Sequence, residues 1–289
     1  MHLSAAIRKE SNGTRFGDVQ RLQPLQPVAT AERNERGAFA SMGGHMRRPW
    51  IIAHRGASAH APENTMAAFQ RALELGAPFI ETDLHLTRDA RFVAIHDKTL
   101  QRTTNGQGAV QDHMLADLRK LDAGLWFDRR FSGERIPTLE EVLAFGREHD
   151  MVFYLEIKYD AAWGMHHALV AALQAANASA RTTVISFDPR TLRSVRELDA
   201  SIMVGLLSER DEGDLVETAL EIGARQICPR HDAMTRALVD RAHESGLHVV
   251  TWTVNEQTEM HAAIAAGVDG VVTDVPDRLR ALIEDLGGA

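Results

Sequence analysis

The chain is poor in cysteine and in long apolar runs. Its single cysteine, Cys228, excludes an internal disulfide, which is typical of proteins from a reducing compartment, and we expect a cytoplasmic location. No stretch is apolar for long enough to span a bilayer, so we expect no stable insertion into a membrane. No charged-then-apolar signal segment opens the chain either. A hydrophobic content of 44% and a charged content of 25% suit an ordinary globular protein.

Positive charge is scarce over most of the chain. Residues 1–48 hold eight Lys and Arg against four Asp and Glu, whereas the remaining 241 residues hold 24 basic and 36 acidic side chains. A body this acidic argues against a nucleic-acid partner, because a phosphate backbone is bound by clustered positive charge. The same acidic excess is compatible with a site for a divalent cation.

Residues 1–48 lack hydrophobic periodicity and are rich in Arg, Gln, Gly and Ala, so we expect a disordered basic lead. Met42 and Met46 are alternative start sites, and SMGGHM could also be the remnant of an expression tag. A transit segment is a third interpretation, which the four acidic residues of the lead disfavour. The folded domain is then expected to span residues 49–289.

From residue 49 onward, short β-branched runs alternate with amphipathic helical segments. This alternation is typical of a parallel sheet, and its length favours the α/β class and a closed TIM (β/α)8 barrel. Nine runs have the composition of strands: WIIAHRG, FIETDLHL, FVAIHD, VFYLEIK, TTVISF, IMVGLL, RQICPR, HVVTWTV and VDGVVTD.

One of these nine runs is surplus to a barrel of eight strands. The link between FIETDLHL and FVAIHD is too short for a crossover helix, so the surplus lies there. We expect either a hairpin that turns at Arg88-Asp89 or a tight return inside the barrel, and both would make Glu81 and His96 neighbours. Residues 97–137 then interrupt the rhythm with several glycines, and we expect a small inserted cap over the barrel mouth after the third strand.

Ionisable residues gather where the predicted strands end, which is where α/β barrels carry out chemistry. Glu81 and Asp83 are two residues apart on one strand and therefore face the same side, and Glu156 ends another strand. Three carboxylates at one mouth would repel one another unless a cation lay among them. Hard oxygen ligands suit Mg²⁺ or Ca²⁺, with Mn²⁺ as a further option.

Two histidines and two cations flank these carboxylates. His54 and His96 end strands and can each give or take a proton near neutral pH. Arg55 and Lys158 add positive charge with donors suited to phosphate oxygens. A metal, two proton-transfer groups and two cationic anchors together favour displacement at phosphorus on a diester.

The sequence resembles the glycerophosphodiester phosphodiesterase family. The shared elements follow the family's order over roughly residues 50–280: AHRGASAHAPENT, IETDLHLTRDARFVAIHD, LQRTTNGQGAV, RIPTLEEVL, LEIK, ISFDP, VTWTVN and GVDGVVTDVP. The resemblance implies a barrel shared with phosphatidylinositol-type phospholipases C and metal-dependent hydrolysis of small glycerophosphodiesters to sn-glycerol 3-phosphate and an alcohol. It also implies roles for nine residues: Glu81, Asp83 and Glu156 as metal ligands, His54 and His96 as the acid–base pair, Arg55 and Lys158 near the phosphate, and Phe187 and Trp252 lining the substrate pocket.

Plainer interpretations stand beside these roles. A lone strand histidine is usually a hydrogen-bonded core residue, and paired charges on a strand can belong to a solvated face. Asn64 fits a helix cap better than a ligand, Glu63 could orient His54 or favour a helix dipole, and Asp274 is at least as well explained by a structural role.

Two other functions are compatible with the same residues. One is a lysophospholipase D-like activity, for which the apolar side chains of residues 97–137 would supply a channel. The other is a non-catalytic phosphodiester-binding module. The head-group alcohol, the ion, the oligomeric state and the division of labour between the two histidines stay open at this point.

Overall fold

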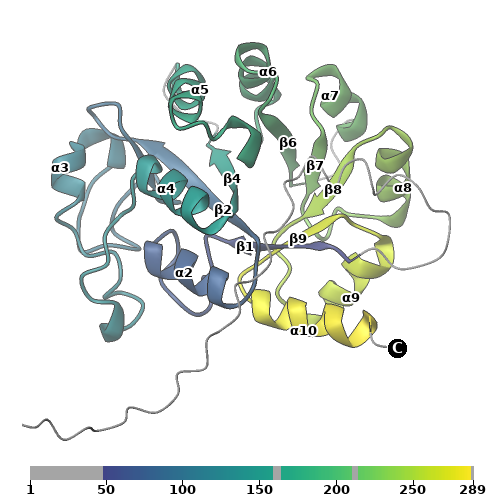
Figure 1. The fold of residues 1–289 in the computed structure, drawn as a ribbon, viewed down its shortest axis with the longest axis horizontal. Coiled ribbons are helices and arrows are strands. Elements are labelled where there is room, and N and C mark those ends of the chain that lie inside the picture. The colour runs from purple at the N-terminus through teal and green to yellow at the C-terminus, as the bar shows by residue number, and fades with distance from the viewer. Residues whose placement is uncertain (1–47, 159–163, 210–213, 288–289) are drawn as a thin grey trace, which may run out of the picture. The chain divides into compact units, whose positions relative to one another are not determined.

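A computed structural model describes residues 48–158, 164–209 and 214–287 (Figure 1). The expected lead at residues 1–48 lies outside these ranges except for its last residue. The strands are β1 (Trp50–His54), β2 (Phe79–Leu86), β3 (Phe92–Ala94), β4 (Val152–Ile157), β5 (Thr182–Ser186), β6 (Met203–Ser208), β7 (Gln226–Pro229), β8 (His248–Thr251) and β9 (Gly270–Thr273). The helices are α2 (Met66–Glu74), α3 (Leu115–Leu118), α4 (Leu139–His149), α5 (Met165–Ala175), α6 (Pro189–Leu198), α7 (Leu215–Glu221), α8 (Arg236–Glu244), α9 (Gln257–Ala266) and α10 (Pro276–Gly287). None of these helices is long and apolar enough to cross a bilayer.

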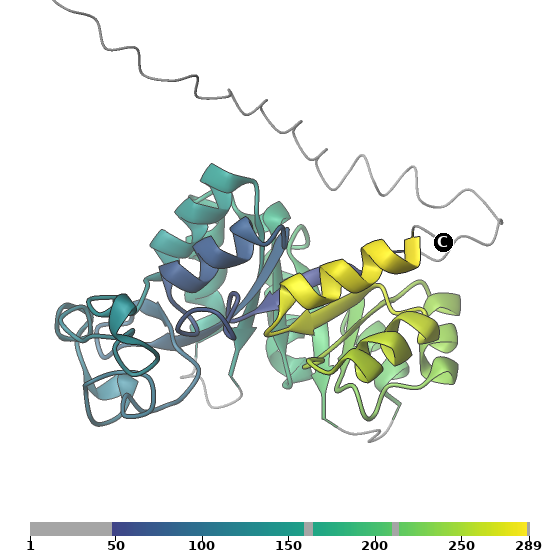
Figure 2. The same ribbon diagram turned by 90° about the horizontal axis from the view of Figure 1, so that it is seen from below.

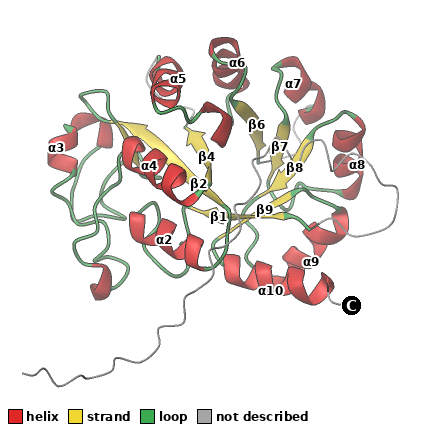
Figure 3. Cartoon of the chain, viewed as in Figure 1, coloured by secondary structure: helices red, strands yellow, loops and turns green. Residues whose placement is uncertain are grey.

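Eight of the strands form the closed parallel barrel that the sequence predicts. Parallel neighbours run in the order β1-β2-β4-β5-β6-β7-β8-β9, and β9 pairs with β1 to close the ring. Helices surround these strands (Figure 3). The predicted TIM barrel is therefore confirmed.

The surplus strand is β3, which pairs antiparallel with the end of β2. The predicted hairpin is confirmed, but its register differs from the expectation that Glu81 lies across from His96. Leu84 pairs with Ala94, and the Ile95 N–H donates to the Asp83 carbonyl at 3.1 Å. This register places position 96 opposite position 82, because each step along one strand is matched by a step back along the other.

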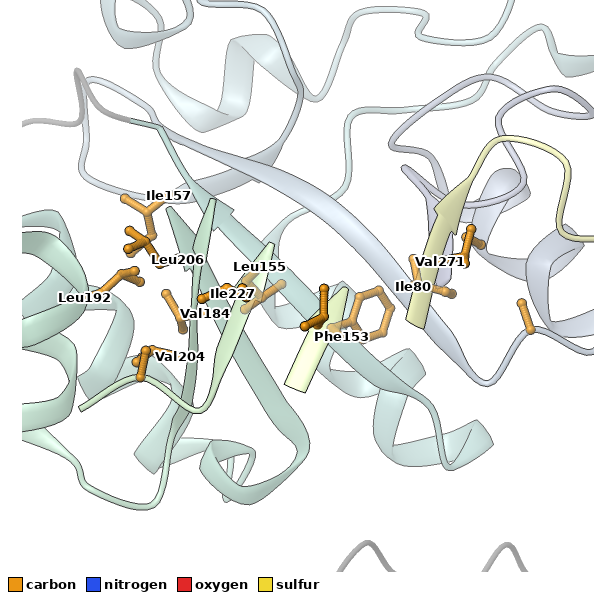
Figure 4. Packing of buried hydrophobic residues seen from close by; sticks show 14 of the residues in the cluster. Ile80, Phe153, Leu155, Ile157, Val184, Leu192, Val204, Leu206, Ile227 and Val271 are labelled. Carbon is orange, nitrogen blue, oxygen red and sulfur yellow. The ribbon is translucent and has the colours of Figure 1, made fainter. Parts of the chain in front are cut away.

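Side chains alternate between two apolar layers, one inside the barrel and one between barrel and helices. Along β4, Phe153, Leu155 and Ile157 belong to the outer layer, part of which Figure 4 shows, whereas Tyr154 belongs to the inner one. The two-residue period therefore turns Glu156, at the end of this strand, toward the interior of the barrel. The same alternation on β2, with Ile80 and Leu84 in the outer layer, directs Glu81 and Asp83 inward.

The insertion, residues 97–137, lies between β3 and α4 and packs around a small core of its own. In Figures 1 and 2 it lies beside α2 and α4. Leu118 is buried in this core, and Leu115 and Leu121 pack against it, whereas Leu125 and Trp126 are exposed. Three of the leucines expected to form a lipid channel, Leu115, Leu118 and Leu121, are therefore used in the insertion's own packing.

A capping box begins helix α4. The Thr138 hydroxyl accepts from the Glu141 N–H at 3.3 Å, and the Glu141 carboxylate accepts from the Thr138 N–H at 2.8 Å. We expect Thr138→Ala to lower the free energy of unfolding by about 1 kcal/mol, because one helix N–H loses its acceptor. Urea unfolding of Thr138→Ala beside Thr138→Ser measures this effect. Equal stability of the two variants would contradict it, since serine keeps the hydroxyl.

Candidate active site

Two neighbouring strands, β2 and β4, bring the three predicted carboxylates together at the carboxyl end of the barrel. In the parallel registers, His54 of β1 lies beside Glu81 of β2, and Asp83 of β2 lies beside Glu156 of β4. Glu81, Asp83 and Glu156 are buried, and each offers an oxygen within 4.8 Å of the others. The structure therefore assembles the acidic cluster that the sequence predicts.

Arg55 and Lys158 contact this cluster directly. The Lys158 ammonium lies 2.6 Å from Asp83 Oδ1 and 2.8 Å from Glu156 Oε1. The Arg55 guanidinium Nε lies 3.4 Å from Asp83 Oδ2, and the Arg55 backbone N–H donates to Glu81 Oε2 at 3.0 Å. The turn after β1 that allows this approach needs Gly56, which has φ +82° and whose Cβ would lie 2.6 Å from Ala68. Both predicted phosphate anchors are therefore beside the carboxylates.

The cluster fits a divalent cation. Burial raises the pKa of Glu81 well above its ordinary value, and Asp83 and Glu156 raise it further. Burial, with the charge of Asp83, also raises the pKa of Glu156 to about 7. The buried Glu81 Oε1 has no hydrogen-bond partner among the described residues. A set of buried, mutually repelling oxygens of this kind could bind a hard metal ion, which would relieve the repulsion.

Asp83 is held ionised within the same cluster. Burial alone would raise its pKa, but Lys158 and Arg55 outweigh that effect and hold the pKa well below the ordinary range. The Asn64 amide donates to Asp83 Oδ2 at 2.8 Å, and the Asn64 carbonyl oxygen accepts from the Thr82 hydroxyl at 2.6 Å. The sequence interpretation of Asn64 as a helix cap is wrong, because Thr65 caps α2.

His54 is oriented by a carboxylate from the opposite end of the chain. Its Nδ1 lies 2.6 Å from Asp274 Oδ1, and its Nε2 lies 3.9 Å from Glu81 Oε2. Asp274 also accepts hydrogen bonds from the Ser58 hydroxyl and the Asn255 amide. Burial would raise the pKa of Asp274, but its hydrogen bond with His54 is the first of several that lower it to about 2. An ionised carboxylate at Nδ1 favours the ring tautomer with its proton there, which leaves Nε2 free to exchange a proton.

His96 has the same arrangement with a different carboxylate. Its Nδ1 lies 2.7 Å from Asp97 Oδ1, and its backbone carbonyl lies 3.0 Å from His85 Nε2. Burial lowers the pKa of His96, and the charges of Lys158 and Arg55 lower it further against the pull of Asp83. Each predicted acid–base histidine thus has a carboxylate at Nδ1.

Phe187 and Trp252 follow β5 and β8 and lie against each other. Their ring centroids are 5.6 Å apart at an interplanar angle of 80°. Both rings pack against the apolar layer inside the barrel, and the Trp252 indole N–H donates to the Cys228 carbonyl at 2.7 Å. A cavity of roughly 450 Å³ opens beside Phe187 and is further lined by Pro189, Leu206, Leu207, Ser208, Glu209, Leu215 and Thr218.

Several residues of this site were not assigned from the sequence. The sequence leaves Asp274 open between a structural and a catalytic role, and it predicts no role for Asp97, although Asp97 directly follows a strand-end histidine. Glu63, expected to serve His54 or a helix dipole, instead accepts from Arg55 at 2.9 Å and from Arg102 at 2.7 and 2.8 Å. Among these residues, only Asp97 could have been predicted from the sequence, because it directly follows His96 at the end of a predicted strand.

Comparisons with known proteins agree on one family. The sequence model of the Glycerophosphoryl diester phosphodiesterase family matches residues 54–278. A glycerophosphodiester phosphodiesterase of Caldanaerobacter subterraneus is 40% identical over 239 residues, covering 82% of this chain and 98% of that protein. A glycerophosphodiester phosphodiesterase of Bacillus subtilis is 36% identical over 249 residues, covering 78% and 83%.

Solved structures show the same relationship. An Oleispira antarctica phosphodiesterase, crystallised with the product sn-glycerol-3-phosphate, has a TM-score of 0.76 and 28% identity, covering 82% of this chain and 97% of that one. A glycerophosphodiester phosphodiesterase of Agrobacterium tumefaciens has a TM-score of 0.72 and 28% identity, covering 81% and 99%. On the extent of the family match and of the identity to its members, the chain belongs to the glycerophosphoryl diester phosphodiesterase family.

Proposed function

We propose that the protein hydrolyses glycerophosphodiesters to sn-glycerol 3-phosphate and an alcohol, with the help of one divalent cation. The observation that carries this proposal is the buried triad of Glu81, Asp83 and Glu156 flanked by His54 and His96, each with a carboxylate at Nδ1. The names of the relatives and the product bound to the Oleispira antarctica structure support the same substrate class.

Glu81, Asp83 and Glu156 are the residues that would hold the ion, which is Mg²⁺ or Ca²⁺, or else Mn²⁺. When bound, such an ion polarises a phosphoryl oxygen and so favours attack at phosphorus. Arg55 and Lys158 hold the phosphate and offset the charge that builds on it during displacement. Phe187 and Trp252 would line the pocket around the rest of the substrate.

Proton transfer falls to the two histidines. One of them removes a proton, through its Nε2, from the attacking oxygen of water or of the neighbouring glycerol hydroxyl. The other returns a proton to the leaving alkoxide, so that the alcohol departs neutral. Attack by the hydroxyl would first give a cyclic phosphodiester, which a water molecule, deprotonated by this second histidine, then opens to sn-glycerol 3-phosphate. The carboxylates at Nδ1 hold both rings in place and stabilise each imidazolium while it lasts. We also propose a cytoplasmic location, on the ground that the single cysteine forms no internal disulfide.

Release of sn-glycerol 3-phosphate from glycerophosphocholine tests the reaction. We expect no release after treatment with EDTA and restored release with one of Mg²⁺, Ca²⁺ or Mn²⁺, because three clustered carboxylates bind phosphate poorly without a cation. A coupled assay with glycerol 3-phosphate dehydrogenase measures the product. Turnover that is unaffected by EDTA would contradict the metal-dependent mechanism, and no turnover with any ion would contradict the substrate.

A lysophospholipase D-like activity is the second candidate, and the cavity beside Phe187 favours it. Five of the eight lining side chains are apolar, which suits an acyl chain on the glycerol. Comparing glycerophosphocholine with its acylated form under the same metal ion separates the two candidates. A higher kcat/KM for the acylated substrate would establish the lipid activity.

A further inference from the structure

Arg102 belongs to the insertion, yet its side chain reaches two carboxylates at the edge of the active site. Nη1 and Nη2 donate to Glu63 Oε2 and Oε1 at 2.7 and 2.8 Å. Nε and Nη2 donate to Asp97 Oδ2 and Oδ1 at 2.7 and 3.0 Å. One planar guanidinium therefore makes a two-point contact with each carboxylate, which a lysine ammonium cannot reproduce.

Each of these carboxylates has a second partner in the active site. Glu63 accepts from Arg55 Nη1 at 2.9 Å, and Asp97 bonds His96 Nδ1 at 2.7 Å. Arg102 is thus linked through Glu63 to Arg55, a proposed phosphate anchor, and through Asp97 to His96, a proposed proton-transfer histidine. Glu63 lies in the loop between β1 and α2, whereas Arg102 and Asp97 both lie in the insertion, so Arg102 joins the insertion to this loop.

We propose that Arg102 is a positioning residue that fixes Arg55 and His96 relative to each other, so that phosphate binding and proton transfer depend on the same guanidinium. This inference rests on the proposed phosphodiesterase function. It also gives the insertion a role in the reaction, since residues 97–137 supply both Arg102 and the Asp97 carboxylate that bonds His96.

Burial and charge support this role. The Glu63 side chain is only 13% exposed and forms ion pairs with Arg55 and Arg102. Without these two arginines, its buried charge would be costly. The hydrogen bond from Arg102 is the main reason that the pKa of Asp97 is lowered to about 2, which keeps this carboxylate ionised beside His96. A guanidinium that bonds both carboxylates also limits how strongly either one attracts its other partner.

The test compares Arg102→Met and Arg102→Lys with a matched arginine of the same insertion. Arg119 makes a two-point contact with Glu141 at 2.6 and 2.8 Å but touches neither Glu63 nor Asp97, so Arg119→Met is the control. We expect Arg102→Met to lower kcat/KM for glycerophosphocholine on the order of ten- to hundredfold, the range for losing a partner that orients a ligand. Arg102→Lys should recover only part of this loss, and Arg119→Met should match the wild type.

The variants Glu63→Gln and Asp97→Asn distinguish positioning from mere stabilisation. We expect Glu63→Gln to act mainly on KM through Arg55, Asp97→Asn mainly on kcat through His96, and Arg102→Met on both. Each double variant with Arg102→Met should lose less than the product of the two single losses, because the residues act as one unit. Independent, multiplying losses in both double variants would overturn the proposal.

A spectroscopic measurement keeps the proposal separate from the proposed function. The Nδ1 proton of His96, assigned by its disappearance in His96→Ala, should shift in Arg102→Met and Asp97→Asn but not in Arg119→Met. Wild-type turnover with an unchanged resonance and unchanged kinetics in Arg102→Met would overturn the role of Arg102 and leave the phosphodiesterase standing. If the wild-type protein hydrolyses no glycerophosphodiester but the His96 resonance still shifts in Arg102→Met, the coupling would be supported and the proposed function rejected.

Discussion

Replacing Glu81 with glutamine should lower kcat/KM for glycerophosphocholine by roughly three decades, because polarisation of phosphate by a metal ion is worth several kcal/mol and each 1.36 kcal/mol is tenfold in rate. Glutamine keeps the shape of the side chain and an oxygen for the Arg55 N–H, which donates to Glu81 Oε2 at 3.0 Å. The loss should therefore come from the charge alone. Saturating concentrations of the activating ion should recover little of it, because the missing negative charge is not restored when the ion is bound.

Metal binding gives a second measurement that does not depend on turnover. Isothermal titration with the activating ion should show weaker binding by Glu81→Gln than by the wild type, and the ion should raise the melting temperature of the variant less. Glu74→Gln is the matched control, because Glu74 is an exposed carboxylate that pairs with Arg71 and Gln70, its neighbours on α2. Equal ion affinity in Glu81→Gln and Glu74→Gln would remove Glu81 from the ligand set.

The same variant should weaken a pH effect on stability in the metal-free protein. Glu81 and Glu156 have folded pKa values above the ordinary 4.5, and that of Glu156 is about 7. The folded state therefore holds their protons more tightly than the unfolded chain does, and stability falls as the pH rises from 4.5 through the folded pKa values. Metal-free Glu81→Gln should lose less stability than the wild type between pH 5 and pH 8, as urea unfolding would show.

The alternation of side chains explains how much of this site was predictable from sequence. Once a strand is assigned, a period of two places Glu81 and Asp83 on one side, and the parallel registers bring Glu156 beside them. Every such inference uses spacing within one element and the rule that chemistry lies at the carboxyl ends of barrel strands. For this reason the barrel, the hairpin and the acidic cluster could be predicted from the sequence.

The supporting residues depend on contacts that spacing does not reveal. His54 and Asp274 are 220 positions apart, and they meet only because β9 closes the barrel against β1. Asn64 resembled a cap because its residue type suits one, but the adjacent Thr65 takes that role and leaves the amide for Asp83. The order of the strands can be predicted from the alternation of strands and helices. The partners of individual side chains can be identified only once the geometry of the closed barrel is known.

Alanine in place of His54 or His96 should lower kcat by about two to four decades, the usual contribution of a positioned acid or base. His243→Ala is the matched control, because His243 also bonds a carboxylate, Asp269 Oδ2 at 2.8 Å, before the start of β9 and so at the other end of the barrel. Near-full turnover in His96→Ala or in His54→Ala would contradict its assignment to the acid–base pair.

A substrate with an activated leaving group separates the two histidines. The p-nitrophenyl ester of glycerol 3-phosphate needs no proton on its departing oxygen, so the variant that lacks the acid should recover most of its rate, whereas the variant that lacks the base should not. His96 has the lowered pKa, because it is buried and lies near Lys158 and Arg55. If it is the base, it stays neutral and active below its ordinary pKa of 6.5, and the acid limb of the kcat/KM profile lies below that pH. If it is the acid, the same lowered pKa limits the rate on the alkaline side, and the p-nitrophenyl substrate should abolish that limb.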